Sequence, residues 1–297
     1  MYLEHVKGDT WCIVTDFCRI PFYKLDKKNI VMMDTGLRDP MDGGILDLLK
    51  KSDLKVSHIL TTHAHIDHVG NHAILKKEHG ARVYMTLFDA AVTGSPLCLK
   101  SYMYGSSYKF ILEHADSMLC KTDELILQGQ KNIIIEGLSF EILNLPGHAP
   151  EHLGFVTPDG VAYIADLLMT EHVLRSVRIP HITCWEEDLK SKRYICNTQY
   201  PAYIMAHNGI CDSIDSLVKE NIEVIEEKIK VVEDFLCDYM TMDEIVARGI
   251  KEFGVKNDTG WKLNTAYVNI RTFLEHLLDS KRVINVAENG VTRYIKI

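Results

Sequence analysis

The stretch Thr61-Thr62-His63-Ala64-His65-Ile66-Asp67-His68-Val69-Gly70-Asn71 places three imidazoles and one carboxylate within six consecutive positions. The apolar run at residues 58–60 predicts a short buried strand before it, and residues 72–79 predict a helix after it. We therefore expect the cluster on a loop at the end of a strand, where α/β sheets usually carry their chemistry.

The spacing within this stretch predicts metal ligands aimed at two neighbouring points. His63 and His65 are two residues apart, so in an extended backbone their side chains point the same way. Asp67 and His68 follow on the turn into the helix and can aim at a second point. Imidazole and carboxylate suit zinc, and iron or manganese less selectively. A chance grouping in a chain with 14 histidines is the alternative, so the motif stays a hypothesis until its structural context agrees.

Four further segments follow in an order that carries a resemblance to a known family. They are Val31-Met32-Met33-Asp34-Thr35-Gly36, Leu145-Pro146-Gly147-His148-Ala149-Pro150-Glu151-His152, Ala162-Tyr163-Ile164-Ala165-Asp166 and Tyr203-Ile204-Met205-Ala206-His207-Asn208-Gly209. With the histidine stretch, they resemble the metallo-β-lactamase-fold hydrolases (glyoxalase II-like enzymes included), whose signature is H-x-H-x-D-H. The resemblance covers residues from about 10 to 212 and implies an α/β fold, the αββα sandwich of that family.

The resemblance also implies a site for two divalent metal ions, zinc before iron or manganese. The implied ligands are His63, His65 and His148 for the first ion, Asp67, His68 and His207 for the second, and Asp166 as the bridge. Asp67 has a second interpretation, as the catalytic proton acceptor.

Two further residues are implied as supports for these ligands. Asp34 would orient a ligand through a hydrogen bond, and a plain turn aspartate before Gly36 is the alternative. His152 would support the loop that carries His148. We expect neither His172 nor His181 to be a ligand, because the family pattern already fills both metal positions.

Such a site predicts hydrolysis without a serine or cysteine nucleophile. A divalent metal lowers the pKa of bound water from about 16 to about 7, which supplies a metal-bound hydroxide at neutral pH. We expect the substrate to be a small ester, thioester or lactone. An RNase-like phosphodiesterase of the same fold and a non-haem iron redox protein are the alternatives, because the fold does not decide the substrate.

Composition narrows the setting of this chemistry. The 297 residues are 46% hydrophobic and 25% charged, with a net charge of −8, so nothing global draws the chain to nucleic acid or to an anionic membrane. The 8 cysteines show no C-x-x-C spacing, the N-terminus lacks a signal-peptide layout, and no apolar run approaches the ~18 residues of a membrane span. We expect a cytoplasmic enzyme, which argues against a periplasmic role in antibiotic resistance.

The remaining pattern predicts the flanking elements. Strands are expected at residues 10–14, 30–33 and 81–85, helices at 43–51 and 186–196, and hairpins at 132–143 and 155–162. Residues 89–123 break the alternation. We interpret them as an insertion whose aromatic residues, Tyr102 and Tyr104 among them, form a wall that selects substrate or pack as a small satellite core.

The chain changes character after His207, and we expect two domains, a catalytic domain at residues 1–212 and a helical domain at residues 213–297. Helices are expected at 214–238, 242–253 and 265–278, followed by a hairpin around Asn289-Gly290. This order resembles a small winged-helix module. Its charges are mixed, so we expect it to serve dimerisation or to cover the active site rather than to bind DNA.

Overall fold

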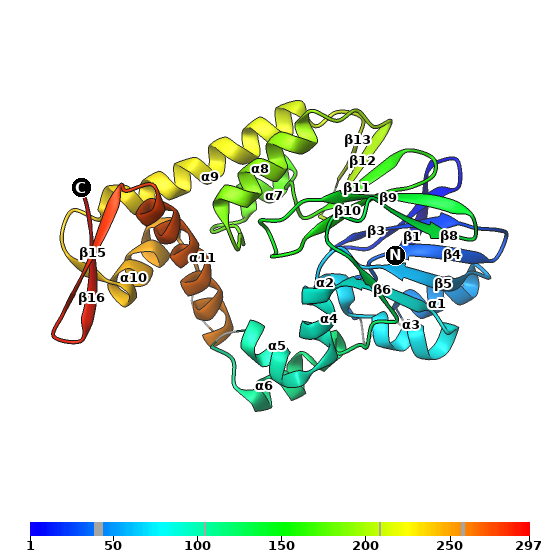
Figure 1. The fold of residues 1–297 in the computed structure, drawn as a ribbon, viewed down its shortest axis with the longest axis horizontal. Helices are drawn as coiled ribbons and strands as arrows, with labels where there is room; N and C mark the ends of the chain where they lie inside the picture. The colour runs from blue at the N-terminus through cyan, green and yellow to red at the C-terminus, as the bar shows by residue number, and fades with distance from the viewer. Residues whose placement is uncertain (39–43, 104, 208, 257–258) are drawn as a thin grey trace. The chain divides into compact units, whose positions relative to one another are not determined.

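The computed structural model describes residues 1–38, 44–103, 105–207, 209–256 and 259–297 (Figure 1). Its contacts divide the chain into two compact units. The first unit comprises Met1–Leu145, Glu151–Leu168 and Asn197–Ile214, and the second comprises Pro146–Pro150, Met169–Cys196 and Asp215–Ile297.

Among the described residues, the first unit contains a seven-stranded sheet whose strands follow one another in chain order. They are β1 (Tyr2–Lys7), β2 (Thr10–Val14), β3 (Arg19–Lys24), β4 (Asn29–Met33), β5 (Lys55–Leu60), β6 (Arg82–Thr86) and β7 (Glu124–Ile126). The strands pair antiparallel from β1 to β4 and parallel from β4 to β7. The parallel half therefore brings the carboxyl ends of β4, β5 and β6 to one edge of the sheet.

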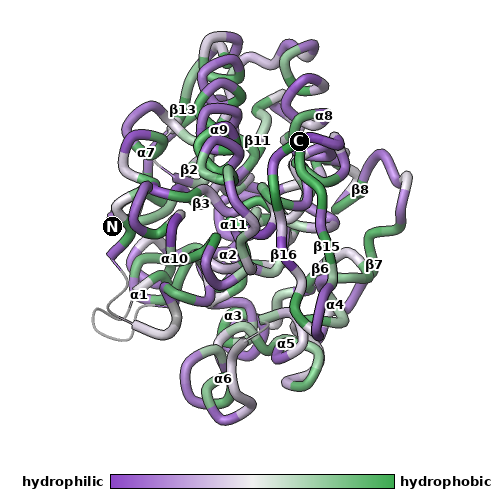
Figure 2. The backbone as a smooth tube through the Cα atoms, turned by 90° about the vertical axis from the view of Figure 1, so that its left-hand side faces the viewer, coloured by the Kyte–Doolittle hydropathy of each residue, from purple (hydrophilic) through white to green (hydrophobic). Residues whose placement is uncertain are grey.

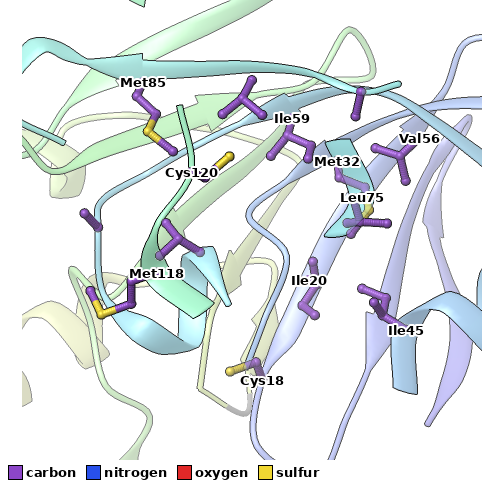
Figure 3. Close-up of a cluster of buried hydrophobic side chains, with 14 of the residues drawn as sticks. Cys18, Ile20, Met32, Ile45, Val56, Ile59, Leu75, Met85, Met118 and Cys120 are labelled. Carbon is purple, nitrogen blue, oxygen red and sulfur yellow. The ribbon is translucent and has the colours of Figure 1, made fainter. Parts of the chain in front are cut away.

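Short helices connect the parallel strands and cover one face of this sheet. They are α1 (Gly44–Lys51), α2 (Ile66–Val69), α3 (His72–His79), α4 (Leu87–Gly94), α5 (Pro96–Tyr102) and α6 (Tyr108–His114), with a 3₁₀ turn at Asp116–Met118. The apolar core beneath them joins Ile20, Met32 and Ile59 of the strands to Ile45 of α1 and Leu75 of α3 (Figure 3). This core fixes the helices that flank the histidine stretch.

The second sheet of the first unit has the strand order β13-β12-β11-β10-β9-β8. Its strands are β8 (Asn132–Ile135), β9 (Leu138–Asn144), β10 (Leu153–Val156), β11 (Val161–Ala165), β12 (Ala202–Met205) and β13 (Gly209–Cys211). Val31, Met33 and Leu60 of the first sheet share one buried cluster with Phe155 and Tyr163 of the second. The two sheets are thus layers of one sandwich, each contributing alternate side chains to the core between them.

The second unit is helical with a small sheet. Its elements are α7 (Glu171–Ser176), α8 (Trp185–Cys196), α9 (Asp215–Phe235), α10 (Met242–Phe253) and α11 (Gly260–Asp279), with strands β14 (Met240–Thr241), β15 (Val283–Glu288) and β16 (Val291–Lys296) in the order β14-β16-β15. Hydrophobic and hydrophilic residues alternate along α9 (Figure 2). Its apolar stripe, which includes Ile225 and Ile229, shares a buried core with Trp185 of α8 and Phe273 of α11.

The two layered sheets agree with the predicted α/β sandwich, while some element predictions were incomplete. The sequence analysis did not predict β1, β3, β7, β13, β14 or α7. It began the last helix at Thr265, five residues after its observed start at Gly260. Thr259 caps that helix by accepting a hydrogen bond from the backbone N–H of Lys262, which lengthens it. The winged-helix identity and the domain boundary at residue 212 stay predictions.

Candidate metal centre

Asp34 is the buried hub beneath the histidine stretch. It follows β4 with φ of 62°, and its carboxylate accepts hydrogen bonds from the backbone N–H and the hydroxyl of Thr62 at 2.8 and 2.7 Å. It also accepts from the Tyr163 hydroxyl at 2.9 Å and from Nδ1–H of His68 at 2.8 Å. The left-handed backbone of a non-glycine residue costs about 1–3 kcal/mol, which this bonding offsets. Asp34 thus fixes the ring of His68 so that Nε2 points away from it.

The first ligand group lies at the carboxyl end of β5. His63, His65 and Asp166 each offer one ligand atom, and these atoms lie within 4.8 Å of one another. Nε2 of His63 is 2.8 Å from Nδ1 of His65 and 4.0 Å from Oδ2 of Asp166. Asp166 reaches this point because β11 ends in a bulge at Ala165, whose φ is 45°.

The second ligand group comprises Asp67, His68, Asp166 and His207, whose ligand atoms also lie within 4.8 Å of one another. Nε2 of His207 is 3.3 Å from Oδ2 of Asp67 and 3.6 Å from Oδ2 of Asp166. Nε2 of His68 is 3.4 Å from the same Asp166 oxygen. Asp166 therefore belongs to both groups through one oxygen atom.

The negative charges of the second ligand group favour binding of a cation. Burial lowers the pKa of His207, but hydrogen bonds to Asp166 and Asp67 and the charges of these carboxylates outweigh burial and raise it to about 10. Burial likewise opposes the protonated form of His68, while the charges of Asp166, Asp34 and Asp67 raise its pKa well above the ordinary value. Concentrated carboxylates thus draw positive charge to this point, which protons supply when nothing else does.

Hydrogen bonds to His152 and His207 support the ligands from behind. His152 donates Nδ1–H to the carbonyl of Leu145 at 3.0 Å, and its Nε2 accepts from the backbone N–H of Asp166 at 3.4 Å. Burial lowers the pKa of His152 to about 4, so it stays neutral. His207 lies 3.2 Å by its Nδ1 from the carbonyl of Phe17, which leaves Nε2 for the second group. Asp34 thus contacts His68, and His152 contacts Leu145, which precedes the loop of His148, and Asp166.

His148 is carried by the short segment Pro146–Pro150, which clusters with the second unit. Its Nδ1 is 3.1 Å from the carbonyl of His181, and the hydroxyl of Thr183 donates to the His148 carbonyl at 2.9 Å. Gly147 has φ of +132°, and an added Cβ would lie 2.2 Å from the backbone of Asp188. This segment is therefore held tightly against residues 181–191, and it requires glycine.

The sequence analysis missed three residues that hold the histidine stretch. His72 is fully buried between two threonine hydroxyls. Its Nδ1 lies 2.8 Å from Oγ1 of Thr35, and its Nε2 lies 2.8 Å from Oγ1 of Thr61. Asp89 accepts from the backbone N–H of Ala64 at 2.9 Å, and the Tyr102 hydroxyl lies 2.8 Å from Nε2 of His65. No local spacing marks these contacts, because each joins segments that meet only in the fold. Tyr104 lies outside the described residues.

The comparisons with known proteins decide the family. The model of the metallo-beta-lactamase superfamily matches residues 22–207, which is more than half of the chain. The chain belongs to the metallo-β-lactamase superfamily. The matched range includes every residue of the two ligand groups.

Relatives and solved structures within this superfamily agree on the fold. The chain is 29% identical over 144 residues to hydroxyacylglutathione hydrolase GloC of Haemophilus influenzae, which covers 48% of this chain and 63% of that relative. It is 24% identical over 204 residues to lactamase-like protein notP of an Aspergillus species, covering 68% and 54%. The match thus spans less than two thirds of either relative.

The similarity of the backbone extends over nearly all of the chain. A metallo-beta-lactamase family protein from Thermus thermophilus superposes with a TM-score of 0.75 at 18% identity, covering 97% of this chain and 99% of that one. A beta-lactamase domain protein from Burkholderia ambifaria superposes with a TM-score of 0.76 at 15% identity, covering 99% of this chain and 94% of that one.

Among the helices that the structure describes, none combines the length and apolar character needed to cross a membrane.

Proposed function

We propose that this member of the superfamily is a dinuclear metal-dependent hydrolase of a small thioester, ester or lactone. The observation that carries the proposal is the pair of adjacent ligand groups that share Oδ2 of Asp166. His63, His65 and His148 would hold the first ion, and Asp67, His68 and His207 the second, with Asp166 between them. Zinc suits this donor set best, and iron or manganese less well.

The second ligand group fits a metal ion on its geometry. Tetrahedral nitrogen and oxygen ligands of zinc stand about 3.4 Å apart, because each lies roughly 2.0–2.1 Å from the ion. The four distances that join Nε2 of His68 and of His207 to Oδ2 of Asp67 and of Asp166 are 3.3, 3.4, 3.6 and 3.9 Å. The buried Nε2 of His68 also has no hydrogen-bond partner among the described residues, which a ligand atom does not need.

The hydrogen bonds on the far side of the rings support the same assignment. Nδ1–H of His68 donates to Asp34, and Nδ1–H of His207 and of His148 donate to the carbonyls of Phe17 and His181. In its neutral form, each of these rings therefore carries its lone pair on Nε2. The loop that carries His148 starts and ends on the first unit, where the backbone N–H of Leu145 donates to the His152 carbonyl at 2.9 Å.

A pair of divalent ions, when bound, acidifies water and polarises a carbonyl oxygen, which is the chemistry that hydrolysis of an acyl bond needs. The protein's own part is to hold the ligands still and to manage protons. Asp67 is 17% exposed and lies 3.3 Å from His207, so its carboxylate would hold the second ion or accept a proton during hydrolysis. Asp166 is 9% exposed and is held through its backbone by His152, which suits it to the shared position.

Thioesters are the acyl substrates that the relatives favour. Hydroxyacylglutathione hydrolases recur among them, and an atrochrysone carboxyl ACP thioesterase of Cryptosporiopsis is 22% identical over 205 residues. The net charge of −8 gives no support to the phosphodiesterase alternative. No contact among the described residues favours the redox alternative over hydrolysis.

A substrate panel tests this proposal. The zinc-loaded chain is assayed against a hydroxyacyl-glutathione thioester, an aliphatic lactone, a β-lactam and a bis-aryl phosphodiester, beside His65→Ala and the control His114→Ala, which changes an exposed histidine of α6. We expect hydrolysis of the thioester or the lactone by the parent and the control, and a loss of at least about 100-fold in His65→Ala. Full activity in His65→Ala, or turnover of the phosphodiester alone, contradicts the proposal.

A further inference from the structure

His65 differs from the other histidines of the two ligand groups in the ring atom that it presents. The rings of His68 and His207 have Nδ1 engaged by Asp34 and by the Phe17 carbonyl, so that Nε2 faces the ligands. His63 likewise has Nδ1 at 3.0 Å from the Thr62 hydroxyl and Nε2 toward the group. In His65 the order is reversed, because Nδ1 lies 2.8 Å from Nε2 of His63. Its Nε2 must therefore carry the proton when Nδ1 acts as a ligand.

The acceptor for that proton comes from a helix that the sequence analysis left without a firm role. The Tyr102 hydroxyl, at the end of α5, lies 2.8 Å from Nε2 of His65. The two rings are nearly parallel, with an interplanar angle of 23° and centroids 6.1 Å apart. An N–H in the plane of the imidazole therefore meets the phenol oxygen at hydrogen-bonding distance.

The position of Tyr102 is fixed by packing rather than by the site itself. Leu99, one turn earlier in α5, is fully buried in the core of the first unit, and Phe88 of α4 packs edge-on against the Tyr102 ring at 5.5 Å. A phenol hydroxyl can accept a hydrogen bond as well as donate one, so its oxygen can act as the acceptor.

The same segment also holds the backbone beside His65. Asp89 accepts from the backbone N–H of Ala64 at 2.9 Å, and its other oxygen accepts from the Thr86 hydroxyl at 2.7 Å. Asp89 is itself 1% exposed, so it is a fixed anchor. One helical segment, residues 86–102, therefore contacts the chain between His63 and His65 and the ring of His65.

We propose that Tyr102 is a positioning residue for the metal centre, which accepts the Nε2–H of His65 and so fixes the tautomer and the rotamer in which Nδ1 is the ligand atom. The inference rests on the proposed function, because it names His65 as a metal ligand. Without the phenol oxygen, the contact that favours one tautomer and one orientation of the His65 ring is removed. Loss of such a contact behind a ligand weakens metal binding by about 10- to 100-fold.

The test compares Tyr102→Phe with the control Tyr108→Phe, which removes the hydroxyl of an exposed tyrosine on α6. Phenylalanine keeps the packing against Phe88 and removes only the oxygen. Zinc affinity is measured by competition with a chromophoric chelator, and the His65 tautomer of the zinc-loaded chain by long-range ¹H–¹⁵N correlation, with His65→Gln to assign the signal. We expect one zinc equivalent to weaken about 10- to 100-fold in Tyr102→Phe, with the second unchanged. We also expect the Nε2–H tautomer of the parent to become a mixture.

The outcomes separate this inference from the proposed function. If Tyr102→Phe binds zinc with the same affinities as the parent chain, the inference is wrong and the proposed function stands. Weakened zinc binding with an unchanged tautomer also overturns it, because the phenol then acts through packing alone. A parent chain that binds no zinc overturns both the proposed function and the inference, because His65 then has no ion to bind.

Discussion

At the scale of single residues, Asp166 links the two ligand groups, because one of its oxygens belongs to both. A carboxylate between two cations lowers their mutual repulsion, which two neutral ligands would not do. Its backbone N–H is held by His152, and the residue before it adopts a strained backbone with φ of 45°. The strained backbone at Ala165 raises the free energy of the fold locally and places this Asp166 oxygen between the two ligand groups.

Asp166→Asn tests that role. The amide keeps the shape but loses the negative charge, so we expect both metal ions to bind about tenfold more weakly or worse. Zinc titration measures both affinities, and Asp212→Asn, at an exposed aspartate outside the ligand groups, is the control. If only one of the two ions binds more weakly, Asp166 does not bridge the two metal ions.

The buried His72 predicts a pH dependence of stability. Burial lowers its pKa from 6.5 to about 4, so the unfolded chain binds more protons between these pH values. This contribution is fully present above pH 6.5 and is lost as the pH falls toward 4. The lost free energy is on the order of 3 kcal/mol, since one pKa unit is worth about 1.4 kcal/mol.

His72→Gln removes the titrating group while keeping partners for the Thr35 and Thr61 hydroxyls. We expect the free energy of unfolding of the metal-free variant to fall less between pH 6.5 and 4 than that of the parent. Denaturant unfolding across this range measures the difference, with the exposed His114→Gln as control. Equal slopes in the parent and His72→Gln would contradict the assignment.

At the scale of elements, much of the frame was predictable, because strong patterns mark it. The apolar run of β5, the helix α3 with its left-handed cap at Gly80, and the hairpin of β8 and β9 all follow from local sequence. β3 was missed because it contains Pro21, which usually argues against an inner strand. The contacts of Tyr102 and Asp89 were missed because they join segments that only the tertiary fold brings together.

The turn between β9 and β10 gives a prediction about an element. Gly147→Ala places a Cβ about 2.2 Å from the Asp188 backbone at a φ that favours glycine, so the segment that carries His148 must shift. We expect a lower melting temperature and weaker binding of one zinc equivalent, with the other unchanged. Gly94→Ala is the control, because an added Cβ there meets nothing within 4 Å. Unchanged zinc binding in Gly147→Ala would argue against His148 as a ligand.

At the scale of the whole molecule, the contacts link segments that are far apart along the chain. Residues 169–196 cluster with residues 215–297, and Trp185, which is 2% exposed, shares its core with α9 and α11. The sequence analysis set a domain boundary after residue 212 because the pattern changes there. A contact between distant helices leaves no trace in local periodicity, so the partners of α8 were not predictable.

A chain truncated after Asp212 tests whether residues 1–212 fold alone. It would lack α9, α10 and α11, and so would expose the apolar residues of α8 and of residues 179–182 that pack with them. We expect this fragment to aggregate or to unfold without a cooperative transition, as followed by gel filtration and circular dichroism. A monomeric fragment with a sharp melting transition would contradict this expectation and support the boundary at residue 212.

The most direct measurement is the anomalous difference map at the zinc edge from crystals of the zinc-loaded protein. The account predicts two peaks in each chain, one beside His63, His65 and His148 and one beside Asp67, His68 and His207, with Asp166 between them. A map with no peak among these side chains, or with zinc bound only elsewhere on the chain, would contradict the central claim.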